Sequence, residues 1–193
     1  MLLREGRARS VAGFDLSAEA IGEARGRFQA PELEFAEADV TRLPVPDQSF
    51  DLYVSFETIE HLPDDRGFVA EAVRVLRPGG KFLCSTPNRR LFHPGATLHD
   101  RPVNPFHVRE YNLQEYEALL REFFRHVEWY GQTRFPASYC GWLARLGKVS
   151  PLAAVRFHQF TKLGRLSWRG AAMHAPFPLR PGDHPEILIA VCS

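Results

Sequence analysis

The sequence lacks several features that mark special classes of protein. No apolar run approaches the roughly 18 residues needed to cross a bilayer, and residues 1–6 hold no apolar core long enough for a signal peptide. The three cysteines, Cys84, Cys140 and Cys192, are far apart and odd in number, so they form no disulfide framework. With an ordinary apolar content of 45%, these absences predict a single globular domain over residues 1–193 in the reducing cytoplasm.

Acidic residues are missing from one long segment. Between Gln132 and Gly182 the chain holds eight basic residues and no acidic one, although its net charge is only +1. The aromatic residues Trp142, Phe157, Phe160 and Trp168 lie among the basic ones. This mixture suits a small-molecule acceptor that is anionic or lipid-linked, peripheral contact with a membrane or, less readily, a nucleic acid. It is equally typical of a helical lid with a solvated basic face. We expect residues 132–182 to form an insert or lid between the last two strands.

Strand-like and helix-like segments alternate along the chain, which is typical of an α/β fold with a parallel sheet. The expected strands are Ser10–Phe14, Leu33–Ala38, Phe50–Phe56, Lys81–Ser85, His126–Tyr130 and Glu186–Val191. Ser17 is the expected N-cap of the first helix, and Asn112 with Glu115 resembles a capping box. A middle helix carries apolar residues at helical spacing up to Leu76 and is expected to stop at Pro78-Gly79-Gly80.

Three motifs carry a resemblance to a known family. They are Val11-Ala12-Gly13-Phe14-Asp15-Leu16-Ser17, then Ala38-Asp39-Val40 with Leu43-Pro44 and Ser49-Phe50-Asp51, then Phe56-Glu57-Thr58-Ile59-Glu60-His61-Leu62 with Val75-Leu76-Arg77-Pro78-Gly79-Gly80. In this order they resemble the class I S-adenosylmethionine-dependent methyltransferase superfamily, over roughly Val11 to Tyr130 and again at the last strand. Within it, Glu-x-x-Glu-His is similar to ubiquinone-biosynthetic and small-RNA 3′-end O-methyltransferases. The resemblance implies a Rossmann-like α/β sheet and O-methylation of a small hydroxylated acceptor.

The resemblance also implies which residues bind S-adenosylmethionine. Asp15, followed by Leu16, matches the carboxylate that binds the ribose, and an acidic residue at the end of a strand can accept hydrogen bonds from both ribose hydroxyls. Asp39 and Val40 match the position that holds adenine, and Phe56 matches the residue beside the methionine portion. The alternatives are that Asp15 helps to start the next helix, Asp39 is an ordinary loop aspartate and Phe56 is a core aromatic.

Glu57, Glu60 and His61 stand at positions i, i+3 and i+4, so on a helix they share one face and can converge on one ion. Two carboxylates and an imidazole suit Mg²⁺, Mn²⁺ or Zn²⁺, and the hard oxygen ligands favour the first two. The resemblance implies that such a metal binds adjacent hydroxyls of the acceptor and lowers their pKa. It also implies that His107 is a further ligand of the metal. Two alternatives stay open: His61 acts as a metal-free general base, or the cluster is structural.

One part of the family pattern has no counterpart. Such enzymes carry an acidic-x-Gly-x-Gly-x-Gly loop after a central first strand, whereas Gly6 and Gly13 are the only glycines before Asp15. We therefore expect an N-terminally incomplete methyltransferase domain, which lacks the first central strand of its sheet and binds S-adenosylmethionine weakly or not at all. The alternative is a degenerate domain without activity that serves as a binding or regulatory module.

Overall fold

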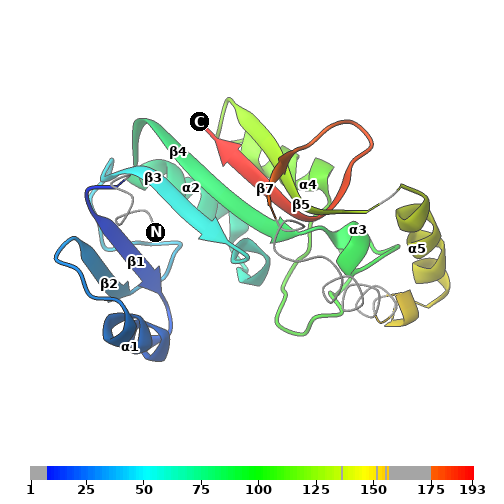
Figure 1. The fold of residues 1–193 in the computed structure, drawn as a ribbon, viewed down its shortest axis with the longest axis horizontal. Helices are drawn as coiled ribbons and strands as arrows, with labels where there is room; N and C mark the ends of the chain where they lie inside the picture. The colour runs from blue at the N-terminus through cyan, green and yellow to red at the C-terminus, as the bar shows by residue number, and fades with distance from the viewer. Residues whose placement is uncertain (1–7, 136, 151, 155, 157–174) are drawn as a thin grey trace.

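The computed structural model describes residues 8–193 apart from residues 136, 151, 155 and 157–174 (Figure 1). The elements along the chain are β1 (Val11–Asp15), α1 (Ala18–Arg27), β2 (Leu33–Glu37), β3 (Phe50–Phe56), the 3₁₀ turn η1 (Ile59–His61), α2 (Asp65–Val75), β4 (Leu76–Pro87), α3 (Arg89–Phe92), α4 (Leu113–Arg121), β5 (Val127–Phe135), α5 (Ala137–Val149), β6 (Phe177–Pro178) and β7 (His184–Cys192). None of the described helices is long and apolar enough to span a membrane.

The first unit is β1, α1 and β2. The two strands pair in parallel, with Val11 opposite Leu33 at one end of the register. The predicted N-cap is confirmed, since the Ser17 side chain accepts a hydrogen bond from the backbone N–H of Ala20. A side-chain contact then fixes the helix to its strand: the Arg25 guanidinium donates to the Phe35 carbonyl at 2.6 Å.

The larger sheet has the strand order β3-β4-β7-β5-β6. β3 and β4 are parallel, and β7 lies antiparallel to both β4 and β5, so the last strand of the chain fills the middle of the sheet. Figure 1 shows α2 and α4 behind this sheet. Their buried side chains pack on the strands in one core that includes Phe68, Phe82, Tyr116, Leu120 and Leu188. Burial of this apolar area is the main term that stabilises the unit.

The two sheets are separate. Among the described residues no strand pairs with both β1 and β3, and the two units meet where the rings of Phe14 and Phe50 lie 6.5 Å apart. Leu52, Val54 and Phe56 alternate along β3 and leave one of its faces exposed. This arrangement of parallel strands and helices agrees with the expected Rossmann-like α/β fold class.

Several boundaries differ from the prediction, and three of the differences have a clear cause. The middle helix ends at Val75 instead of including Leu76, because Leu76 already pairs with Phe50 of β3. The segment Pro78-Gly79-Gly80 therefore lies inside β4, where Gly79 adopts a φ of 81° beside an irregularity in the ladder. β5 continues to Phe135 because its far end pairs with β7.

Candidate functional site

The residues expected to bind the cofactor lie at the carboxyl ends of β1, β2 and β3. Asp15 is exposed at the end of β1, and its Oδ1 accepts a hydrogen bond from the backbone N–H of Ser17 at 2.8 Å. It therefore takes part in starting α1, while the carboxylate stays accessible to solvent. Leu16 beside it is also exposed. Both residues thus border the open side of the first sheet.

Asp39 follows β2 and stabilises a turn. Its Oδ1 accepts from the backbone N–H of Thr41 at 2.8 Å and from the Thr41 hydroxyl at 2.7 Å, and these bonds lower the pKa of the carboxyl. Val40 packs against the main core, whereas Phe56 at the end of β3 is 55% exposed. Phe56 is therefore not a core aromatic within the described structure.

Glu57 departs from the predicted geometry. Only Ile59–His61 form a helical turn, and Glu57 has a φ of 53°, outside the helical region. Its Oε1 accepts a hydrogen bond from the Ser85 hydroxyl at 2.7 Å, which draws the carboxylate toward β4. The helical i, i+3, i+4 face expected for Glu57, Glu60 and His61 was therefore wrong, because the chain turns sharply between Phe56 and Ile59.

Glu60, His61 and His107 nevertheless come together. Each offers one ligand atom, and these atoms all lie within 4.8 Å of one another. Nε2 of His61 is 4.0 Å from Oε1 of Glu60, and the two imidazole rings stand edge to face with their centroids 4.9 Å apart. Two histidines and one carboxylate form a set that suits a divalent transition metal.

Hydrogen bonds orient both imidazoles in the same sense. Nδ1 of His61 lies 2.8 Å from the carbonyl oxygen of Phe106, which can only accept, so Nδ1 carries the proton. Nδ1 of His107 lies 2.8 Å from Oε1 of Glu110, and Nε2 accepts from the Asn104 amide at 2.8 Å. In each neutral ring the lone pair is therefore on Nε2. Histidines that bind metals are commonly held in this way by an acceptor on the other nitrogen.

Burial changes the charge balance of the cluster. Glu60 is 1% exposed, and this burial is the main cause that raises its pKa to about 7, aided by the charge of Glu57. Burial of His107 opposes its protonated form, but the hydrogen bond and charge of Glu110, together with the charges of Glu60 and Glu57, outweigh burial and raise the pKa of the imidazole. A cation in the cluster would favour the charged form of Glu60, which the buried site otherwise disfavours.

The long loop after β4 carries His107 to the cluster. The backbone N–H groups of Val108 and Arg109 donate to the carbonyl oxygen of Glu60, at 2.8 and 3.2 Å. Glu110, Asn104 and the Phe106 carbonyl, which hold the two histidines, were not singled out in the sequence. The spacing of three residues between His107 and Glu110 is a weak signal for this pair.

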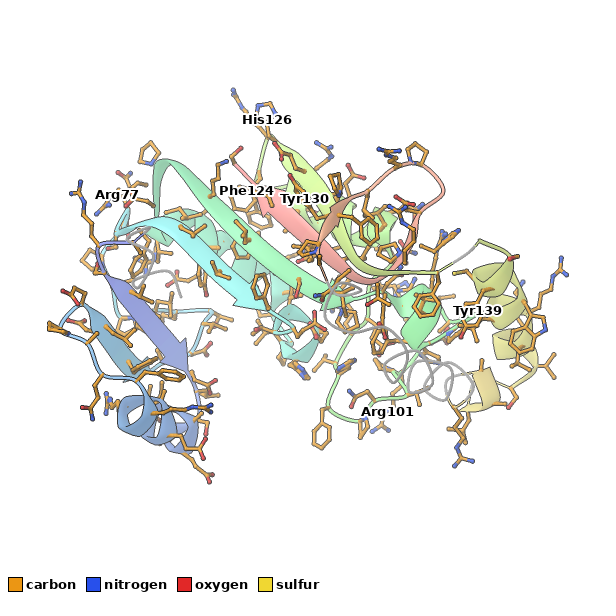
Figure 2. All side chains as sticks on the ribbon, in the orientation of Figure 1. Arg77, Arg101, Phe124, His126, Tyr130 and Tyr139 are labelled. Carbon is orange, nitrogen blue, oxygen red and sulfur yellow. The ribbon has the colours of Figure 1, made fainter. Side chains whose placement is uncertain are left out.

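A cavity adjoins the cluster. It has a volume of about 950 Å³ and lies between the start of α2, the long loop and α4. Its wall includes His107, together with Asp65, Arg109 and Arg101; Figure 2 labels Arg101 on this loop. A volume of this size can hold a small ligand, and His107 connects the cavity to the cluster.

Comparisons with known proteins show what this chain is similar to. Residues 1–84 match a family of methyltransferase domains. A probable S-adenosylmethionine-dependent methyltransferase of Mycolicibacterium smegmatis is 47% identical over 121 residues, 63% of this chain and 45% of the relative. The phthiotriol/phenolphthiotriol dimycocerosates methyltransferase of Mycobacterium tuberculosis is 36% identical over 107 residues, 54% of this chain and 40% of the relative. A fatty-acid O-methyltransferase of M. smegmatis is 34% identical over 115 residues, 58% of this chain and 42% of the relative.

The chain thus spans less than half the length of these relatives. Among solved structures, an S-adenosylmethionine-dependent methyltransferase of Thermotoga maritima covers 94% of this chain and 72% of its own length, with a TM-score of 0.63 and 16% identity. At that identity the likeness shows the fold alone. The fold is that of the class I methyltransferases, and the sequence is similar to methyltransferase domains over residues 1–84 and to the named relatives over about half of the chain.

Proposed function

We propose that this chain serves an S-adenosylmethionine-dependent methyltransferase that methylates a hydroxyl group of a small, lipid-like acceptor with the help of a divalent metal. The observation that carries the proposal is the convergence of Glu60, His61 and His107 within 4.8 Å, next to the ends of the strands where the cofactor residues lie. The two imidazoles shift the metal preference from Mg²⁺ toward Mn²⁺, because imidazole suits transition metals better.

The cofactor residues fit the adenosine half of S-adenosylmethionine. Asp15 presents an exposed carboxylate that would bind the ribose hydroxyls, and Asp39 and Val40, just after β2, would hold the adenine ring. Phe56 offers an exposed ring beside the expected methionine portion. When bound, S-adenosylmethionine supplies a methyl group on a positively charged sulfur, which an oxygen nucleophile can attack.

Glu60, His61 and His107 would hold the metal against the acceptor. A divalent ion held there would supply Lewis acidity that lowers the pKa of an acceptor hydroxyl, and the proton would pass to solvent. The cavity beside His107 would receive the hydroxylated end of the acceptor. A lipid-like acceptor is supported by the names of two relatives, the phthiotriol dimycocerosates methyltransferase and the fatty-acid O-methyltransferase.

A metal-free reaction is the second candidate, and one contact favours it. Because Nδ1 of His61 is held by the Phe106 carbonyl, Nε2 is available to take the proton of the acceptor hydroxyl. His61 would then be the general base, and no metal would be needed. A non-catalytic binding or regulatory module is the third candidate; it would bind a partner without cofactor and without turnover.

Calorimetric titration with Mn²⁺ separates the first two candidates. Glu60→Gln and His107→Ala should each abolish Mn²⁺ binding, because each removes a ligand from a set of three. Glu57→Gln tests whether Glu57 also ligates: the contact of Glu57 with Ser85 predicts that this variant keeps most of its affinity. Unchanged Mn²⁺ binding by Glu60→Gln would exclude the metal centre.

Activity is tested with S-adenosylmethionine that carries a labelled methyl group and with hydroxylated lipids as acceptors. If the unchanged protein binds no Mn²⁺ and His61→Ala no longer transfers the label, the results would favour His61 as a metal-free general base. Asp15→Ala should weaken cofactor binding by about tenfold or more, since two hydrogen bonds to a charged group are lost. If Asp15→Ala binds the cofactor as tightly as the unchanged protein does, Asp15 is not a cofactor-binding residue.

A further inference from the structure

The outer face of α5 carries a row of exposed apolar and basic side chains that takes no part in the site above. Trp142, Arg145, Lys148 and Val149 are all exposed on this helix, and Leu152 continues the row. Positions 142, 145 and 149 are separated by three or four residues, so they lie on one face of α5, and Leu152 follows shortly after its end. We call these five residues the outer row. α5 ends at Val149; the Ser150 N–H still donates to the Leu146 carbonyl, and the Ala154 N–H donates to the Ser150 carbonyl.

Packing fixes which way the helix faces. The opposite side of α5 contributes Cys140 and Leu143 to a small second core with Leu91 of α3 and Phe135 of β5. Gly147 also lies against Pro94, where a Cβ atom would collide with the Pro94 carbonyl oxygen. With its inner side buried in this way, the outer row must face away from the core. Figure 2 shows α5, with Tyr139 labelled, at the end of the molecule opposite to β1 and β2.

The apolar members of the outer row are unusually exposed. Val149 is 85% exposed, Leu152 is 51% exposed and Trp142 is 47% exposed. Single apolar residues on a surface are common, but three in one row beside basic side chains are typical of a helix that lies on a membrane surface. Val and Leu add little to the binding of a nucleic acid, so they favour lipid over RNA or DNA.

The two charged residues of the outer row lie in a segment of the sequence whose charged residues are all basic. Arg145 and Lys148 lie within the segment from Gln132 to Gly182, which has no acidic residue. Within the described part of the chain, neither side chain forms an ion pair. Both charges are therefore available to the phosphate groups of anionic lipids, and each basic residue near such a surface strengthens binding by a factor of about five.

We propose that the outer row of α5 docks on the surface of an anionic lipid bilayer, with Val149, Leu152 and Trp142 in the interface and Arg145 and Lys148 on the phosphates. α3 and Pro94, which pack against α5, begin the same loop that carries His107. α5 would therefore lie between the lipid surface and the start of this loop. Docking itself needs neither cofactor nor metal, so the docking proposal is tested independently of the proposed methyl transfer.

Sedimentation with vesicles tests the proposal. The protein should sediment with vesicles of 70% phosphatidylcholine and 30% phosphatidylglycerol, should not sediment with pure phosphatidylcholine, and should be released by salt. The variant Arg145→Glu with Lys148→Glu should bind at least about tenfold more weakly. The matched control is Lys81→Glu with Arg125→Glu, which changes the net charge equally at exposed basic residues outside α5.

A second variant tests the apolar contact separately from the charges. Val149→Ser with Leu152→Ser retains the charges and should weaken binding to the same vesicles, because it removes the apolar contact. Circular dichroism and thermal unfolding show whether each variant folds. Equal vesicle binding by the outer-row and control charge variants would overturn the proposal. The proposal would also be overturned if the protein did not bind the vesicles but bound single-stranded RNA in a salt-sensitive way, and if the outer-row charge variant lost that RNA binding.

Discussion

Glu110 accepts a hydrogen bond from His107 within the buried part of the long loop, with 2.8 Å between Oε1 and Nδ1. The side chains of both residues are nearly inaccessible to solvent, at 2% and 6%. This bond fixes the tautomer of the imidazole and leaves the lone pair on Nε2, where it accepts from the Asn104 amide and where a metal would have to replace that hydrogen bond. Glu110 is thereby a positioning residue for the proposed metal centre, although it offers no ligand atom to the set of three.

Glu110→Gln should lower the pKa of His107, because Glu110 provides the largest influences that raise it. It should also weaken Mn²⁺ binding by about 10- to 100-fold, as is usual for the acceptor behind a metal-bound histidine. The pKa is measured by NMR titration of the His107 ring and the affinity by calorimetry. Glu128→Gln, an exposed change on β5, is the control. An unaltered His107 pKa in Glu110→Gln would show that the bond does not govern the imidazole.

A second polar contact attaches the loop to the start of α2, and it predicts a pH dependence. Burial disfavours the charge on Asp65, but hydrogen bonds from Tyr111 and Arg109 outweigh burial and lower the pKa of its carboxyl. A carboxyl whose pKa is lower in the folded state stabilises the protein above its unfolded pKa, and this stability is lost as the pH falls through the folded pKa. Acid should therefore loosen the loop.

Asp65→Asn should lower the free energy of unfolding at pH 7 by about 1–3 kcal/mol, the range for hydrogen bonds to a charged group. The difference from the unchanged protein should shrink as the pH falls from about 4, where the unfolded carboxyl takes up its proton, through the lower pKa of the folded carboxyl. Urea unfolding at several pH values measures it. Asp51→Asn, which removes an exposed ion pair with Arg77, should change stability by less than about 1 kcal/mol. A difference that does not vary with pH would contradict the assignment to the Asp65 charge.

Local signals in the sequence predicted the elements well, whereas the cluster depended on distant contacts. The limits of β3, the N-cap at Ser17 and the capping box of Asn112 with Glu115 are confirmed, because each rests on neighbours within a few residues. The start of β4 was missed because Leu76 is drawn into the ladder by Phe50, 26 positions earlier. His107 meets Glu60 only because the loop folds back, and no periodic pattern specifies that path.

The capping box of α4 has a further contact that makes Glu115 more important than Asn112. Glu115 Oε2 accepts from the Asn112 backbone, while Oε1 accepts from the buried guanidinium of Arg89 at 2.5 Å. Asn112→Ala should cost about 1 kcal/mol, the usual value for a lost N-cap. Glu115→Gln should cost about 3 kcal/mol, because it leaves the Arg89 charge buried without its carboxylate.

Urea denaturation measures both changes. Glu117→Gln, which alters the exposed pair with Arg121 on the same helix, is the matched control and should cost less than about 1 kcal/mol. Equal losses for Glu115→Gln and Glu117→Gln would mean that the Arg89 contact adds nothing to stability.

The contact between Gly147 and Pro94 gives the last prediction. Gly147→Ala should destabilise the protein by about 1–3 kcal/mol, because the new methyl group collides with the backbone carbonyl of Pro94 and forces α5 away from α3. Gly141→Ala on the same helix has open space around the new Cβ and should instead stabilise α5 by about 0.5–1 kcal/mol, the helix preference of alanine over glycine. Thermal unfolding of the two variants gives opposite signs if α5 packs as described. A stabilising effect of Gly147→Ala would show that α5 does not lie against Pro94, and the orientation of the outer row would then lose its support.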